Sequence, residues 1–106
     1  MKNFSIVIPE HDIHIWNDIL DKYGEQNPYM DSYDCDEFYL HDGANELEIN
    51  KDNIQIFMFI LTHVKLRARW LTVRNQLYKL AKKQALEAGL NEGDWLEGYT
   101  FVPQFH

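Results

Sequence analysis

The sequence predicts an α+β domain with a small antiparallel sheet and a long C-terminal helix. Two observations lead to this fold class: apolar residues alternate with period two in short early segments, and they recur with a four-three spacing over residues 63–88. A chain of 106 residues with 45% hydrophobic composition can bury one core, so we expect residues 1–106 to form a single compact domain. The expected order of elements is strand, helix, three strands and helix.

The first two expected elements are a strand over residues 3–8 and a helix over about 10–23. Apolar residues alternate along the strand, and Pro9 ends it because proline offers no N–H donor to a sheet. Apolar residues then recur at helical spacing. Gly24 is expected to end this helix, because glycine readily adopts the left-handed conformation of a helix stop.

The centre of the chain is expected to contribute three strands, over residues 36–41, 45–50 and 54–61. Asp42 and Gly43 form a dipeptide typical of tight hairpin turns between the first two. The third segment is apolar on almost every side, and its isoleucine and phenylalanine content favours a central strand. The alternative is a mostly α-helical chain, in which residues 53–88 form one helix whose first part is buried all round.

Residues 63–88 are predicted to form the long helix, and Gly89 to end it. One apolar strip of this helix would pack on the sheet. A second strip is formed by Val64, Leu71 and Tyr78. Two apolar strips on one helix predict two packing partners, so we expect the chain to self-associate through the second.

Acidic and basic residues are segregated along the chain, which carries a net charge of −7. Residues 1–52 hold thirteen acids and three bases, whereas residues 53–86 hold seven bases and no acid. The simplest interpretation is that a basic helix and an acidic sheet neutralise one another. The functional interpretation is that the acidic segment, with tyrosines among its carboxylates, docks on a basic protein partner.

We therefore expect a non-enzymatic binding protein that blocks a basic, nucleic-acid-binding type of site by presenting carboxylates in place of phosphates. Small inhibitors, immunity proteins and phage or mobile-element proteins act in this way. The expected partner-binding residues are acidic or aromatic and lie between positions 29 and 48: Tyr29, Asp31, Tyr33, Asp34, Asp36, Glu37, Tyr39, Glu46 and Glu48.

The main alternative is a nucleic-acid-binding regulator that uses the basic helix. Four of its bases would follow one line along the helix and could contact phosphates: Lys65, Arg69, Lys79 and Lys83. The acidic remainder of the chain repels a polyanion, which makes a nucleic-acid partner the less favoured interpretation.

A second alternative is a small metal-dependent enzyme. His11, His14 and Asp18 would share one side of the first helix, at a spacing that could hold a divalent ion. Cys35 and His41 could form a nucleophile–base pair, but the carboxylates beside Cys35 disfavour a thiolate. The sequence contains no recognised catalytic or phosphate-binding motif, so we expect no enzymatic activity, no metal and no cofactor.

The composition also indicates a cellular compartment. The longest apolar run has six residues, Ile56–Leu61, and acids occur within the first twenty residues, so we expect neither a membrane span nor a signal peptide. A single cysteine allows no intramolecular disulfide. These features predict a cytoplasmic protein.

Overall fold

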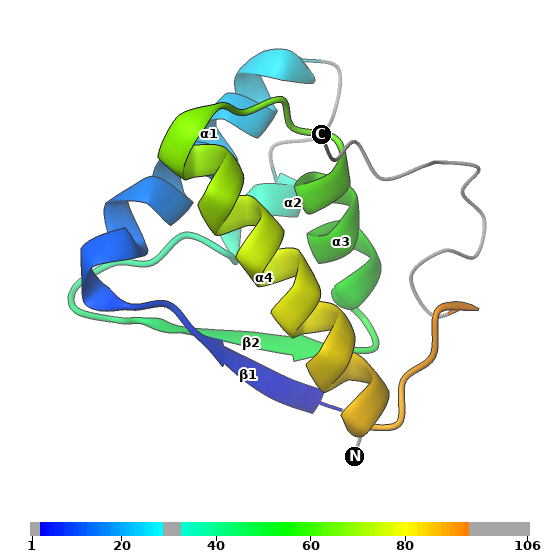
Figure 1. The fold of residues 1–106 in the computed structure, drawn as a ribbon. Coiled ribbons are helices and arrows are strands. Elements are labelled where there is room, and N and C mark those ends of the chain that lie inside the picture. The colour runs from blue at the N-terminus through cyan, green and yellow to red at the C-terminus, as the bar shows by residue number, and fades with distance from the viewer. Residues whose placement is uncertain (1–2, 29–32, 94–106) are drawn as a thin grey trace.

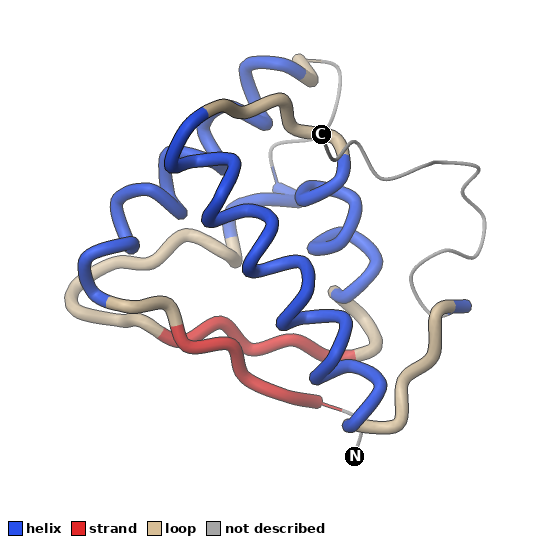
Figure 2. The backbone as a smooth tube through the Cα atoms, in the orientation of Figure 1, coloured by secondary structure: helices blue, strands red, loops and turns tan. Residues whose placement is uncertain are grey.

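The computed structural model describes residues 3–28 and 33–93, and its fold is α+β. The described elements are a two-stranded sheet, three longer helices and two short helical turns. In chain order they are β1 (Asn3–Val7), η1 (Glu10–Asp12), α1 (Ile13–Gln26), α2 (Tyr33–Asp36), β2 (Glu46–Asn50), α3 (Ile54–Thr62) and α4 (Ala68–Glu87). Figure 1 shows α1, α3 and α4 on one side of the two strands, and Figure 2 shows the strands along one end of the molecule.

The sheet forms by antiparallel pairing of the first strand with the segment around Glu48. Phe4 pairs with Ile49 and Ile6 with Leu47, so these four apolar side chains share the face that the helices cover. The opposite face carries Glu46 and Glu48, which are exposed. The predicted strands 3–8 and 45–50 are confirmed, and the structure reports two strands among the described residues where the sequence predicted four.

The predicted strand over 36–41 is wrong. This segment begins at the end of α2 and continues as a turn, so it offers no extended edge to pair with β2. The predicted turn at Asp42 and Gly43 does form: their φ angles are 53° and 84°, and the amide of Ala44 donates to the carbonyl of His41 at 2.9 Å. It connects to β2 without forming a hairpin.

The predicted strand over 54–61 is also wrong, because these residues form α3. Ile54, Phe57, Met58, Ile60 and Leu61 are fully buried, and Ile56 and Phe59 pack against the core with part of their surface exposed. The alternative, one helix over residues 53–88, correctly predicts that the residues of α3 and α4 are helical. It is wrong about continuity, because the non-helical residues 63–67 separate α3 from α4. The long helix therefore begins at Ala68, five residues later than predicted.

The buried side chain of Arg74 stabilises the segment that separates α3 from α4. Its side chain is fully buried, and its Nη1 donates to the carbonyl oxygens of Leu61 at 3.2 Å and Val64 at 3.1 Å. These carbonyls lie at and beyond the end of α3, where the helix no longer supplies N–H partners. Burial lowers the pKa of Arg74 below its ordinary value.

The first helix has the predicted length of 14 residues but begins and ends three residues later than predicted. Residues 10–12 form a separate 3₁₀ turn, and α1 continues through Gly24 to Gln26. Asn27 ends it by donating from its side chain to the carbonyl of Tyr23 at 2.9 Å. Gly24 is thus an interior residue of α1, and the predicted stop at this position is wrong.

The end of α4 is as predicted. Gly89 has a φ of 91°, its amide donates to the carbonyl of Leu86, and the amide of Leu90 donates to that of Ala85. This pair of hydrogen bonds is a Schellman motif, in which glycine adopts the left-handed conformation without strain. Leu90 and Ala85 are both buried, which adds the apolar contact that commonly accompanies the motif.

The core is one cluster built around aromatic rings. Trp16 is fully buried, its ring centroid lies 5.7 Å from that of Phe57, and its Nε1 donates to the carbonyl of Phe38 at 2.8 Å. Asn17 adds two hydrogen bonds to the backbone of Leu40, one through each end of its amide. These contacts fix the segment after α2 against α1.

Candidate functional site

The four described carboxylates of the predicted docking surface are exposed: Asp36, Glu37, Glu46 and Glu48. We call this set the acidic surface. Tyr29 and Asp31 lie outside the described residues, and Tyr33 and Asp34 belong to α2. Glu46 and Glu48 are two residues apart on the outer face of β2, so their side chains lie about 7 Å apart along the strand.

Asn53 connects the two halves of the acidic surface. It is 6% exposed, and its Nδ2 donates to Oε2 of Glu37 at 3.2 Å and to the carbonyl oxygen of Glu48 at 3.0 Å. Its Oδ1 accepts from the amide of Asn50 at 2.8 Å. A single buried amide therefore places the Glu37 carboxylate beside the β2 strand that carries Glu48.

Ion pairs among the described residues do not involve the acidic surface. Arg69 pairs with Asp12 at 2.7 Å, Lys22 lies 4.0 Å from Asp18, and Lys82 pairs with Glu92 at 3.2 Å. In each case the partner of the base lies outside the sheet. The interpretation in which the basic helix neutralises the acidic sheet therefore has no ion pair to support it in the described part of the chain.

Tyr39 faces α1 and is half-buried. Its hydroxyl donates to Oδ1 of Asp21 at 2.7 Å, and its ring stacks on His41 with centroids 6.2 Å apart. Burial, the hydrogen bond and the negative charge of Asp21 together raise the pKa of Tyr39 above its ordinary value of 10.0. The hydrogen bond to Asp21 thus joins Tyr39 to the first helix.

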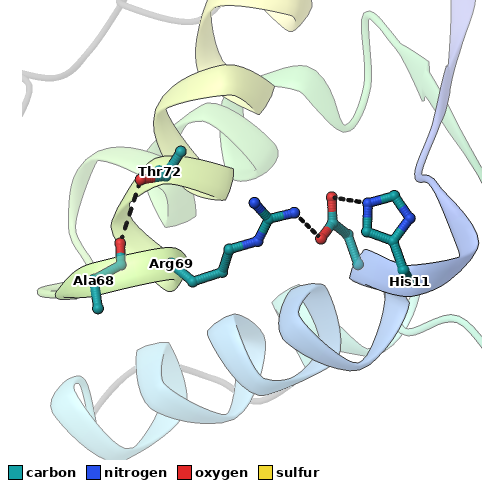
Figure 3. Close-up of polar contacts among 5 residues, drawn as sticks. His11, Ala68, Arg69 and Thr72 are labelled. Atoms are coloured by element: carbon teal, nitrogen blue, oxygen red, sulfur yellow. Dashed lines mark hydrogen bonds and ion pairs between the residues drawn. The ribbon is translucent and has the colours of Figure 1, made fainter.

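The bases of the nucleic-acid alternative do not form one helical line. Lys65 lies in the connection before α4, and Arg69 is directed at Asp12, whose side chain is 8% exposed. Figure 3 shows Arg69 extending from the first turn of α4 across to the segment that carries His11. Lys79 and Lys83 are exposed further along α4.

A groove of about 590 Å³ lies between the end of α1 and the start of α4. We call it the α1–α4 groove. Its lining residues come from the end of α1 and the start of α4: Lys22, Glu25, Gln26, Lys65, Leu66, Arg67 and Trp70. No local pattern in the sequence indicates this groove, because its two walls are far apart along the chain.

Both walls of the α1–α4 groove are fixed by side-chain hydrogen bonds. Gln26 Nε2 donates to the carbonyl of Lys65 at 2.9 Å, and Gln26 Oε1 accepts from the amide of Lys65 at 2.7 Å. Trp70 Nε1 donates to Oδ2 of Asp18 at 2.7 Å, which fixes the orientation of the indole ring. The Lys65 and Arg67 side chains are exposed and take part in no ion pair among the described residues.

The three residues predicted to mediate self-association lie in different environments. Val64 is fully buried in the core, which removes it from any outer surface. Leu71 and Tyr78 are half-buried on α4, and burial raises the pKa of Tyr78. Among the described residues, the exposed large apolar side chains are instead those of Val7 and Leu80, which line a depression between β1 and α4, and of Leu86 near the end of α4.

The histidines of the metal alternative do not form a cluster. His11 lies in the 3₁₀ turn before α1 and sits 3.6 Å from Asp12, whereas Asp18 accepts from Trp70. Across residues 3–28 and 33–93, no group of three His, Cys, Asp or Glu side chains could hold a metal ion. Cys35 is buried at 6% exposure, and the ring of His41 stacks on Tyr39.

The described helices are too short or too polar to cross a membrane. Comparison with known proteins gives no relative: no protein-family model, no curated protein and no solved structure matches this chain. Any functional conclusion therefore depends on the residues themselves.

Proposed function

We propose that this chain is a non-enzymatic binding protein whose acidic surface docks on a basic site of a protein partner and blocks it. The observation that carries the proposal is the set of four exposed carboxylates without an ion-pair partner among the described residues. Carboxylates placed close together repel each other and destabilise a fold slightly. The positive charges of a bound cationic partner would offset this repulsion and attract the carboxylates.

Two features of the acidic surface support docking. The Glu37 carboxylate is held by the buried amide of Asn53, so less side-chain freedom is lost on binding than for a carboxylate free in solvent. Glu46 and Glu48 project from a paired strand whose backbone is fixed by β1. Such a surface accelerates association with a basic partner and excludes acidic competitors.

A matched pair of charge-reversal variants tests the proposal. The test variant carries Glu46→Lys and Glu48→Lys, and the control carries Glu10→Lys and Glu87→Lys, which are exposed and lie outside the acidic surface. Both variants change the net charge equally. Proteins retained from a native cell extract by each immobilised variant are quantified by mass spectrometry, and the retained partner is then titrated by calorimetry.

We expect a basic partner that binds the wild type and the control but binds the test variant at least about tenfold more weakly. A partner that binds both variants equally would contradict the proposed surface. Thermal melts of both variants verify that the fold is retained, since exposed Glu and Lys differ little in their effect on stability.

A further inference from the structure

The α1–α4 groove is a second candidate site, separate from the acidic surface. Three cationic side chains line it, against the carboxylate of Glu25 and that of Asp18, which lies 4.0 Å from Lys22: Lys22, Lys65 and Arg67. This local excess of positive charge occurs in a chain whose net charge is −7. A groove lined by one sign of charge attracts ligands of the opposite sign.

The groove also presents an aromatic wall. Trp70 is half-buried and lines the groove with Leu66, while its Nε1 is already bonded to Asp18. The ring therefore offers its apolar surface to a ligand rather than its single polar donor. The volume of about 590 Å³ lies within the range of about 300–1,000 Å³ that small-molecule pockets occupy.

Both parts of the groove are held in place before any ligand arrives. Gln26 bonds the backbone of Lys65 through its oxygen and its nitrogen, and Asp18 holds Trp70. The Lys65 backbone and the Trp70 ring are thus both anchored to α1. Pre-organisation of this kind lowers the entropic cost of binding.

We propose that the α1–α4 groove binds a nucleoside phosphate, with the phosphate on Lys65 and Arg67, assisted by Lys22, and the base against Trp70. Arginine and lysine side chains commonly bind phosphate oxygens. The planar face of any nucleobase can stack on a tryptophan ring, whatever the base. The same chemistry is offered by a free nucleotide and by one unit of a single-stranded nucleic acid. The lining residues come from the end of α1 and the start of α4, which Figure 1 shows at the far end of these helices from the two strands that carry Glu46 and Glu48.

The first experiment compares two charge-reversal variants of the full chain. Lys65→Glu with Arg67→Glu removes the cations of the groove, and Lys79→Glu with Lys83→Glu makes the same charge change further along α4. The probes are ATP, pyrophosphate and a mixed-sequence eight-nucleotide single strand, titrated at about 50 mM salt by calorimetry and tryptophan fluorescence. We expect the groove variant to bind ATP and the single strand at least about tenfold more weakly, and the control to bind within about threefold of the wild type.

The second experiment isolates the aromatic wall. Trp70→Phe and Trp70→Leu both lose the hydrogen bond to Asp18, so their difference reports stacking rather than that bond. We expect the phenylalanine variant to bind within about threefold of the wild type, and the leucine variant to lose about tenfold or more. Circular dichroism and melting temperature verify the fold of each variant.

The probes distinguish the two sources of the ligand. Tighter binding of the single strand than of ATP assigns the groove to single-stranded nucleic acid, and three phosphate contacts would then weaken binding about 20-fold between about 50 and 200 mM salt. Equal or tighter binding of ATP assigns it to a free nucleotide.

Three outcomes would overturn the proposal. The first is no binding of either nucleotide probe at low salt, and the second is equal loss in the two charge-reversal variants. The third is pyrophosphate binding as tightly as ATP, because the ring would then contribute nothing. The acidic surface is unchanged in all four variants, so these results are independent of the proposed docking function.

Discussion

Replacing Asn53 by alanine should destabilise the protein by about 2–3 kcal/mol. The side chain makes three hydrogen bonds, to the amide of Asn50 at 2.8 Å, the carbonyl of Glu48 at 3.0 Å and the carboxylate of Glu37 at 3.2 Å. A typical internal hydrogen bond contributes about 1 kcal/mol, and a buried group left unpaired costs more. The exposed Glu37 carboxylate is rehydrated in the variant, so most of the loss comes from the two backbone groups.

This loss is large enough to measure directly. Unfolding entropies of about 2.1 cal/mol/K per residue give roughly 0.22 kcal/mol/K for this chain, so the melting temperature should fall by about 10 °C. Urea denaturation followed by tryptophan fluorescence gives the free energy independently, because Trp16 is buried in the core. The control is Glu37→Gln, which keeps an acceptor for Asn53 and should change stability by less than about 0.5 kcal/mol.

Asn53→Asp separates the hydrogen-bond explanation from a simple loss of packing. Aspartate keeps the acceptor for Asn50 but places a carboxylate oxygen against Glu37 and the Glu48 carbonyl. We expect it to be at least as unstable as the alanine variant at neutral pH and to recover when the carboxylates are protonated near pH 4. An alanine variant within about 1 kcal/mol of the wild type, or an aspartate variant as stable as the wild type at pH 7, would refute the role assigned to Asn53.

Two further predictions concern the buried cation and the raised tyrosine pKa. Arg74→Met should lower the free energy of unfolding by about 2–4 kcal/mol, because two buried carbonyls lose their donor, and a urea-denaturation change below about 1 kcal/mol would contradict this. The raised pKa of Tyr39 means that its contribution to stability is complete below pH 10.0 and is lost as the pH rises through the folded-state pKa. The stability advantage of the wild type over Tyr39→Phe should therefore stay constant up to about pH 9 and shrink as the pH rises above 10.0 in denaturation curves, and a difference that stays constant above pH 10.0 would exclude the contact with Asp21.

Some elements could be predicted because a local rule decides them. The alternation of apolar residues along β1 and β2 fixes which face meets the core, and the helices do cover that face. Gly89 ends α4 because glycine has no Cβ to oppose a positive φ. Asp42 and Gly43 form their turn for the same local reason, whether or not the flanking segments pair.

The conformation of α3 could not be predicted in this way. Its residues are apolar on every side, so neither period two nor period 3.6 stands out in the sequence. The strand propensity of isoleucine and phenylalanine is weak compared with burial in a core of helices. The break at 63–67 is likewise a tertiary feature, because Arg74 stabilises the carbonyls of Leu61 and Val64 from the next helix.

The exposed residues of the acidic surface could be predicted from the sequence, but the contacts that position the residues of both candidate sites could not. Exposure of Glu46 and Glu48 follows from their alternation with Leu47 and Ile49. The contact between Asn53 and Glu37 spans 16 residues, and the one between Gln26 and Lys65 spans 39. Contacts at such separations depend on how helices pack, which the spacing of residues along one element does not encode.

The separation of charge follows from the packing of α4. Its buried apolar residues are Val73, Leu77, Ala81 and Ala85, beside the buried base Arg74, and the helix packs on β1. Its exposed bases are therefore held on other sides, where Arg69 meets Asp12 and Lys82 meets Glu92. The outer carboxylates of β2 point away from the same interface. The basic helix therefore packs on the acidic sheet through apolar side chains, and among the described residues no ion pair joins the bases of α4 to the outer carboxylates of β2.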